Sequence, residues 1–351
     1  MNKLFEDFRH FLNERKSDIE YQTIANSFLN AIIETNNEIK ETSEETIETK
    51  YFTIFLKRTP NSPRLNYNLI QKDLLVKKVL KDYKNQIPEE QRTIIVDRED
   101  FLLFKHNLKF AINLTPRLSR YSELGSMDSE NLELQIGYSV DKQKLKDMKT
   151  MNPWVFLKDN VLPQFQRNLK YVIIHEITHA IDNIRAYDKE NLDFGFIHDF
   201  GPKSMKDKSD FTDKERYASR FSEINARAIE TKYFIYNSYD EIENKIKGDS
   251  KGEIIQSVND LSSQNNTTDS IFQIASSIIK NDKRSFINGI AGIEEISFWD
   301  LFKDKSKTNK EYKSKMLNRL LEVFESMREE YLKNPEEHRI YSIVKQIEGI
   351  S

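Results

Sequence analysis

The sequence predicts an α+β protein in which a small mixed sheet and one long helix precede a mostly helical C-terminal part. Three observations lead to this class. Apolar residues recur at helical spacing near the N-terminus, alternate with polar residues at strand spacing between residues 51 and 140, and return to helical spacing from residue 160 onward. These shifts divide the chain into three expected parts, residues 1–50, 51–186 and 187–351.

The first part is expected to be a helical segment. Apolar residues three or four positions apart support this, namely Phe5, Phe8, Phe11, Leu12, Ile24, Phe28 and Ile32. Residues 38–49 form an acidic run without aromatic residues, which predicts a linker or an exposed helix end.

The second part mixes strands with helices. Strands are expected where β-branched and aromatic residues gather or apolar residues alternate, at residues 51–56, 93–96, 108–114 and 132–140. A helix is expected at residues 68–83. The strongest helix candidate covers residues 160–186, with Pro163 suited to its first turn.

The third part begins with a loop-like stretch, residues 187–212, and continues as helix. A helix is expected at residues 213–236, and helical spacing then persists with breaks near residues 262–269 and 303–310. A helical C-terminal subdomain follows from this pattern.

Composition excludes several classes of protein. Lys and Arg number 54 against 57 Asp and Glu, a net charge of −3, so no basic field points to nucleic acid. No stretch has the length and apolarity of a membrane span. The absence of Cys excludes disulfides, thiolate zinc sites and cysteine nucleophiles. No secretory signal is recognisable, so we expect a cytoplasmic protein, with non-classical export left open.

One motif carries chemistry, the segment His175-Glu176-Ile177-Thr178-His179, which reads HExxH. Histidines at i and i+4 of a helix lie on one face about one turn apart, so both imidazoles can reach one Zn²⁺. Glu176 lies beside the first histidine. It can take a proton from a water whose pKa the metal has lowered.

The pattern of the surrounding helix indicates that the HExxH segment is a metal-binding motif and not a chance match. At ~100° per residue, one apolar stripe falls opposite the histidines, so that side is expected in a core and the other in a cleft. The stripe contains Ile173, Ile177, Ala180, Ile181 and Ile184. A chance HExxH in a chain with six His is on the order of one in a hundred. The alternatives are two histidines on a helix surface and a former metal site that has lost activity.

The motif resembles that of the zincin superfamily of metallopeptidases. The metzincin branch places Gly and His where this chain has Asp182 and Arg185, so the resemblance is to the gluzincin-like branch. It implies a zincin-like fold and Zn²⁺ as cofactor, with His175 and His179 as ligands and Glu176 as general base. In that branch a glutamate on a downstream helix is the third ligand.

Glu223 matches that glutamate best. It lies 44 residues after His179, within a predicted helix. Its alternative interpretation is a surface ion pair with Arg227 at i+4. The branch often has an acidic residue three or four positions after the glutamate, whereas this chain has Ala226 and Arg227 there, so the surroundings of the ligand must differ.

Other residues remain open as third ligand or as supporting groups. Glu230, His198 and Asp199 are the other candidate third ligands. Asp182 either orients a ligand imidazole or pairs with Arg185. Candidates for stabilising the transition state, by residue type alone, are His198, Tyr187, Tyr217 and Tyr233.

The resemblance also implies that the strand at residues 132–140, the last before the active helix, pairs with an extended substrate. An ordinary sheet strand is equally compatible with its alternation.

We therefore expect a zinc metallopeptidase acting on a protein or peptide substrate, with no nucleic-acid or membrane partner. Two alternatives remain, namely a binding or structural protein that keeps the fold without catalysis, and a zinc hydrolase of a non-peptide amide.

Overall fold

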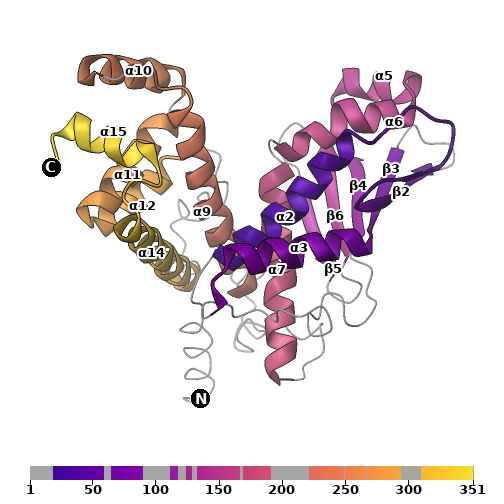
Figure 1. The fold of residues 1–351 in the computed structure, drawn as a ribbon, viewed down its shortest axis with the longest axis horizontal. Coiled ribbons are helices and arrows are strands. Elements are labelled where there is room, and N and C mark those ends of the chain that lie inside the picture. The colour runs from indigo at the N-terminus through magenta and orange to yellow at the C-terminus, as the bar shows by residue number, and fades with distance from the viewer. Residues whose placement is uncertain are drawn as a thin grey trace. The chain divides into compact units, whose positions relative to one another are not determined.

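A mixed β-sheet with helices packed against it forms the first part of the chain in this computed structural model (Figure 1). The structure describes residues 19–58, 65–89, 111–117, 124–128, 133–166, 169–190, 221–248, 250–265, 267–293 and 310–350. The chain divides into two units, Met1–Phe200 and Gly201–Ser351. The predicted α+β class is confirmed.

Six strands form the sheet within the described residues. They are β1 (Thr46–Glu48), β2 (Phe52–Arg58), β3 (Leu65–Gln71), β4 (Ala111–Arg117), β5 (Leu124–Asp128) and β6 (Glu133–Ser139). Their order is β1-β2-β3-β4-β6-β5. Only the β4–β6 pair is parallel, and the other pairs are antiparallel.

The register of the strands gives the sheet one apolar face. Ile54, Leu69, Ile112 and Leu134 are aligned across four strands, and all four are buried. Asn68, Asn113 and Gln135 form a neighbouring row on the opposite face, where side chains are partly or fully exposed. The alternation seen in the sequence therefore marks a sheet that buries one face.

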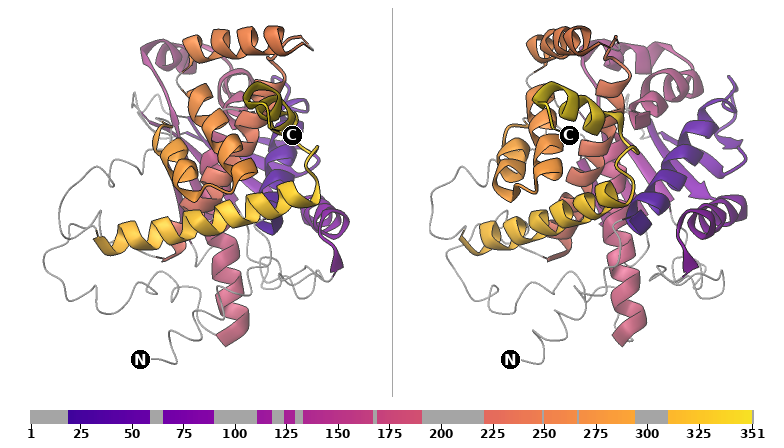
Figure 2. Two further views of the ribbon diagram at one scale, coloured as in Figure 1. Left: turned by 90° about the vertical axis from the view of Figure 1, so that its left-hand side faces the viewer. Right: turned by 60° about the vertical axis from the view of Figure 1, so that its left-hand side comes forward.

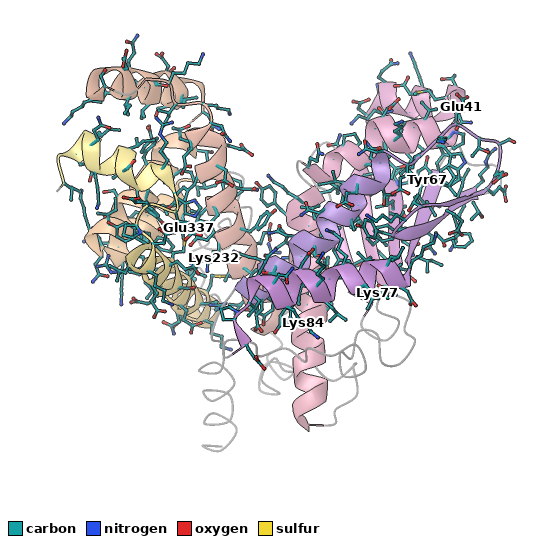
Figure 3. The ribbon with its side chains drawn as sticks, in the orientation of Figure 1. Glu41, Tyr67, Lys77, Lys84, Lys232 and Glu337 are labelled. Atoms are coloured by element: carbon teal, nitrogen blue, oxygen red, sulfur yellow. The ribbon has the colours of Figure 1, made fainter. Side chains whose placement is uncertain are left out.

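The helices of the first unit are α2 (Ile19–Asn36), α3 (Asp73–Gln86), α5 (Lys142–Thr150), α6 (Pro153–Phe156) and α7 (Leu169–Glu190). A π-turn, η2 (Leu157–Val161), and a 3₁₀ turn, η3 (Leu162–Gln166), connect α6 with the chain that leads into α7. Helix α2 packs against both α3 and α7, and α7 packs against β5 and β6. On the apolar face of the sheet, the Tyr67 hydroxyl (labelled in Figure 3) donates to the Pro153 carbonyl at 2.6 Å.

The second unit is entirely helical in its described residues. Its helices are α9 (Phe221–Glu243), α10 (Lys251–Gln264), α11 (Thr267–Lys280), α12 (Lys283–Ala291), α14 (Lys310–Lys333) and α15 (Arg339–Glu348) (Figure 2). Helix α11 packs against all five of the others. The apolar core of this unit includes Tyr239, Ile274, Phe286, Leu320 and Ile343.

A buried lysine joins two helices of the second unit. Lys232 of α9 (labelled in Figure 3) is fully buried, and its Nζ lies 2.8 Å from Glu330 Oε1 and 2.9 Å from Ser326 Oγ, both on α14. A buried ammonium requires such partners, because its desolvation is otherwise unfavourable. The arrangement fixes the position of α14 along α9.

Several predicted elements need correction. Residues 68–71 belong to β3 rather than to a helix, because Leu65, Tyr67 and Leu69 alternate with Asn and complete the sheet ladder; α3 begins at Asp73. The acidic run contains β1, which pairs with β2. Pro163 lies in the 3₁₀ turn η3 and not in the first turn of α7.

Other predicted elements agree with the structure or lie outside its described part. Ile24, Phe28 and Ile32 are buried on α2 as predicted, and β2, β4 and β6 confirm three of the expected strands. The expected strand at residues 93–96 and the apolar residues 5–12 lie outside the described residues. Among the helices that are described, none is long and apolar enough to cross a membrane.

Candidate metal centre

Helix α7 carries both histidines of the motif, and the burial of its apolar side chains stabilises the helix. Ile173, Ile174, Ile177 and Ala180 are buried, and the helix packs against α2 and β5. The Thr178 hydroxyl donates to the Ile174 carbonyl at 2.7 Å, so a polar side chain is satisfied within the helix. The apolar stripe is confirmed up to Ala180; the side chains of residues 181–190 lie outside the described part.

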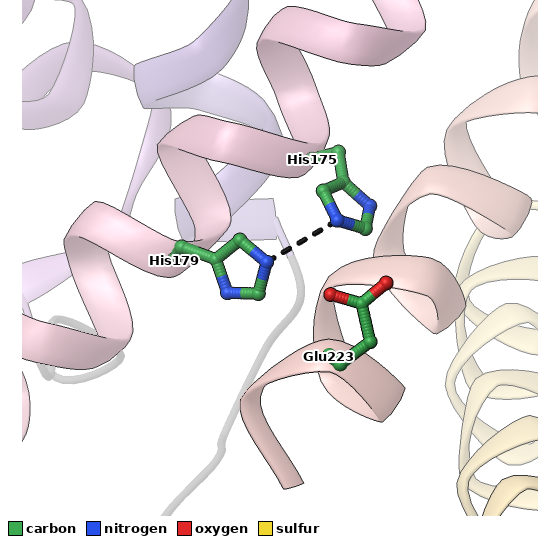
Figure 4. Close-up of side chains that lie close together, drawn as sticks. All are labelled: His175, His179 and Glu223. Carbon is green, nitrogen blue, oxygen red and sulfur yellow. Dashed lines mark hydrogen bonds between the residues drawn. The ribbon is translucent and has the colours of Figure 1, made fainter. Parts of the chain in front are cut away.

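The two histidines face each other on successive turns of α7 (Figure 4). Their Nε2 atoms are 3.2 Å apart, and their rings meet edge to face with centroids 4.8 Å apart. Two Zn–N bonds of about 2.0–2.1 Å in tetrahedral geometry place the nitrogens roughly 3.3–3.4 Å apart. The spacing of the pair therefore suits one zinc ion, which the two imidazoles would hold through Nε2 with their protons on Nδ1.

Burial distinguishes this pair from histidines on a helix surface. His175 is 9% exposed and His179 is 6% exposed. The expected histidine face therefore consists of side chains that are almost fully covered. Buried imidazoles need polar partners, and a cation shared by the two rings would be one for each.

Glu176 is also buried, with 4% of its surface exposed. Its side chain lies against Gly125 of β5: a Cβ at that glycine would be 2.5 Å from Glu176 Oε1, 2.7 Å from Glu176 Cγ and 2.6 Å from Val172 Cγ1. No side chain at position 125 is compatible with these positions of Glu176 and Val172. The glycine therefore makes room for the carboxylate under the β5 backbone.

Helix α9 carries Glu223 in its first turn, and this carboxylate is buried, with 1% of the residue exposed. Arg227, one turn further on, places its Nε 2.7 Å from Glu223 Oε1. The i,i+4 ion pair considered from the sequence is therefore present. It is not a surface pair, however, because the carboxylate is withdrawn from solvent.

Among the described side chains, one group of three has the residue types and spacing to hold a metal ion. It consists of His175, His179 and Glu223, each of which offers one ligand atom, and these atoms lie within 4.8 Å of one another (Figure 4). Two imidazoles and a carboxylate are a ligand set that Zn²⁺ binds in catalytic sites, with a fourth position left for water. The residues present therefore fit a zinc ion.

The other residues considered as third ligand, supporting group or transition-state stabiliser are not placed beside the histidines by the described structure. Glu230 and Tyr233 lie seven and ten residues beyond Glu223 on α9, or about 10 and 15 Å along a helix axis. Burial raises the pKa of Tyr233 to about 12, so its hydroxyl stays protonated at neutral pH. The side chains of Asp182, Arg185 and Tyr187, and the whole of His198, Asp199 and Tyr217, lie outside the described residues.

The strand expected to contact substrate also needs correction. Strand β6 (Glu133–Ser139) pairs with β4 on one side and β5 on the other, so the backbone groups on both its edges are already used. Among the described strands, β5 is the one beside α7 that has a single neighbour. Strand β5 has little signal in the sequence, because its segment Leu-Gly-Ser-Met-Asp has weak strand propensity.

The comparisons with known proteins give no match to this chain among protein-family models, curated proteins or solved structures.

Proposed function

We propose that the chain is a zinc-dependent metallopeptidase. The observation that carries the proposal is the buried group of His175, His179 and Glu223, with Glu176 next to the first ligand in the sequence. Among the described side chains three offer ligand atoms, and three protein ligands with a fourth position for water favour a catalytic site, since structural zinc sites almost always have four protein ligands.

The donor set also favours zinc over other divalent ions. Imidazole nitrogens suit zinc, whereas Mg²⁺ and Ca²⁺ prefer oxygen ligands. When bound, Zn²⁺ would supply a Lewis acid that lowers the pKa of water and polarises a carbonyl.

Glu176 would act as the general base in the proposed reaction. Its carboxylate would accept a proton from the attacking water and return it to the nitrogen of the leaving amine. Glu176→Gln keeps the size of the side chain but cannot take up this proton. We expect this variant to bind zinc like the wild type and to lose peptide hydrolysis by about 10²–10⁴-fold. An active Glu176→Gln protein would contradict the assignment.

Strand β5 would hold an extended peptide substrate in the proposed enzyme. Within the described residues its outer edge pairs with no strand, and backbone pairing there would provide affinity without a strict demand on sequence. Gly125 of the same strand lies against Glu176, so a peptide held there would run close to the general base.

Metal content tests the ligand set. The purified wild type is expected to contain about one zinc per chain by mass spectrometry, and His179→Ala and Glu223→Gln are expected to lose it. Glu230→Gln is the matched control, because it removes the other candidate carboxylate from the same helix. Zinc lost from Glu230→Gln but kept in Glu223→Gln would make Glu230 the third ligand. A wild type that takes up no zinc would contradict the proposal.

A digest of a peptide library separates the proposed peptidase from its two rivals. Cleavage that Glu176→Gln abolishes would support a peptidase. Bound zinc without cleavage of peptides or small amides would favour a binding protein, and hydrolysis of small amides alone would favour a non-peptide amidase.

A further inference from the structure

Arg227 holds the carboxylate that the proposed function assigns to the metal. Its Nε lies 2.7 Å from Glu223 Oε1, and only 2% of the Glu223 side chain is exposed, against 24% of the Arg227 side chain. A guanidinium is charged at every pH a protein tolerates. The buried carboxylate therefore has a permanent positive partner on its own helix.

This partner matters most when no metal is bound. Burying a carboxylate is strongly unfavourable, and an ion pair with an opposite charge offsets much of that penalty. In the metal-free protein, Arg227 thus places next to Glu223 the positive charge that a bound metal ion would provide.

The same contact opposes metal binding. A divalent ion must share Glu223 with the guanidinium or displace it, and the two cations repel each other when both are close to one carboxylate. An interaction that stabilises the metal-free state more than the metal-bound state weakens metal binding, and the loss in binding free energy equals the difference between the two stabilisation energies. We propose that Arg227 is the counter-ion of Glu223 in the metal-free protein and weakens zinc binding. This inference rests on the metal site proposed above.

The alternative role for Arg227 is to orient Glu223 for the metal, and it predicts the opposite change in zinc affinity when Arg227 is removed. Groups that hydrogen-bond to a ligand often orient it and raise metal affinity, and their removal typically costs roughly 10–100-fold in affinity. A counter-ion that competes with the metal has the reverse effect on removal. The direction of the change in affinity therefore decides between the two roles.

The test is Arg227→Met, which removes the charge and keeps most of the side-chain length. Zinc affinity is measured by competition with a chromophoric chelator, and the stability of the metal-free protein by urea unfolding. We expect zinc to bind about tenfold more tightly or better, on the scale of such outer contacts. We expect the urea midpoint of the metal-free protein to fall. Arg227→Lys, which keeps the charge, should stay close to the wild type in both measurements.

Arg328→Met is the matched control for a general loss of stability. Arg328 belongs to the same unit and donates to the Ile279 carbonyl at 3.2 Å. It should lower the urea midpoint without changing zinc affinity. In a Glu223→Gln background, Arg227→Met should cost the metal-free protein less stability than in the wild type, since the buried charge is already gone.

The outcomes separate this inference from the proposed function. If the wild type binds zinc and Arg227→Met binds it equally or more weakly, the counter-ion role is wrong and the metal site stands. An unchanged urea midpoint in metal-free Arg227→Met would likewise overturn the role. If neither protein binds zinc, the metal site itself is wrong, and the inference falls with it.

Discussion

Gly125 determines how closely the backbone of β5 approaches Glu176. Glycine is the residue that leaves this space free, because a Cβ here would be 2.5 Å from Glu176 Oε1. Real Cβ atoms do not approach oxygen so closely, so any substitution must move the carboxylate, the strand or both. Glu176 is the most movable of these, because its side chain has three rotatable bonds.

Gly125→Ala is therefore expected to impair catalysis and leave the metal in place. A displacement of about 1 Å at a catalytic group can cost roughly 100-fold in rate, so we expect a decrease in kcat of that order. Zinc content by mass spectrometry should match the wild type, since the atoms nearest to a Cβ at position 125 belong to Glu176 and Val172 and not to a histidine. A variant with normal kcat would show that Glu176 is not held by β5.

Gly252→Ala is the control for this prediction. A Cβ at Gly252 of α10 would meet nothing within 4 Å. The added methyl group should leave both kcat and zinc content unchanged, which would show that the effect at position 125 comes from lost space.

At the scale of elements, the sequence predicted best those segments whose pattern is local. Helix α7 and the histidines on one face of it follow from residue spacing alone, and so does β6, whose Leu134, Ile136 and Tyr138 are buried as their alternation predicts. Local periodicity is a direct consequence of helix and strand geometry, so it can be read without knowing the fold.

The elements that were missed depend on partners elsewhere in the chain. Strand β5 forms because β6 provides a ladder for it, and the short β1 forms because it pairs with β2. The position of a strand within its sheet is also set by tertiary pairing, so the alternation of β6 cannot show that both its edges are paired. The close approach of Gly125 to Glu176 likewise depends on how α7 packs against β5.

At the scale of the whole molecule, each unit has a core of its own. In the first unit the apolar sheet face is buried, and in the second the core is built around helix α11. The sequence identified Glu223 only through a resemblance, because the burial of this carboxylate, and its grouping with two histidines more than 40 residues earlier, depend on the folded chain. Composition and periodicity carry no such long-range information.

Zinc binding should therefore appear as a property of the folded chain. An ion that binds the folded state alone stabilises it, by about 2.7 kcal/mol when its free concentration is 100 times Kd. For a chain of this size we expect a rise of a few degrees in Tm, measured by differential scanning calorimetry with added zinc against a chelator. His179→Ala should show no rise. Equal stabilisation of the wild type and His179→Ala would mean that zinc acts elsewhere on the protein, and no stabilisation of the wild type would argue against a metal centre in the folded chain.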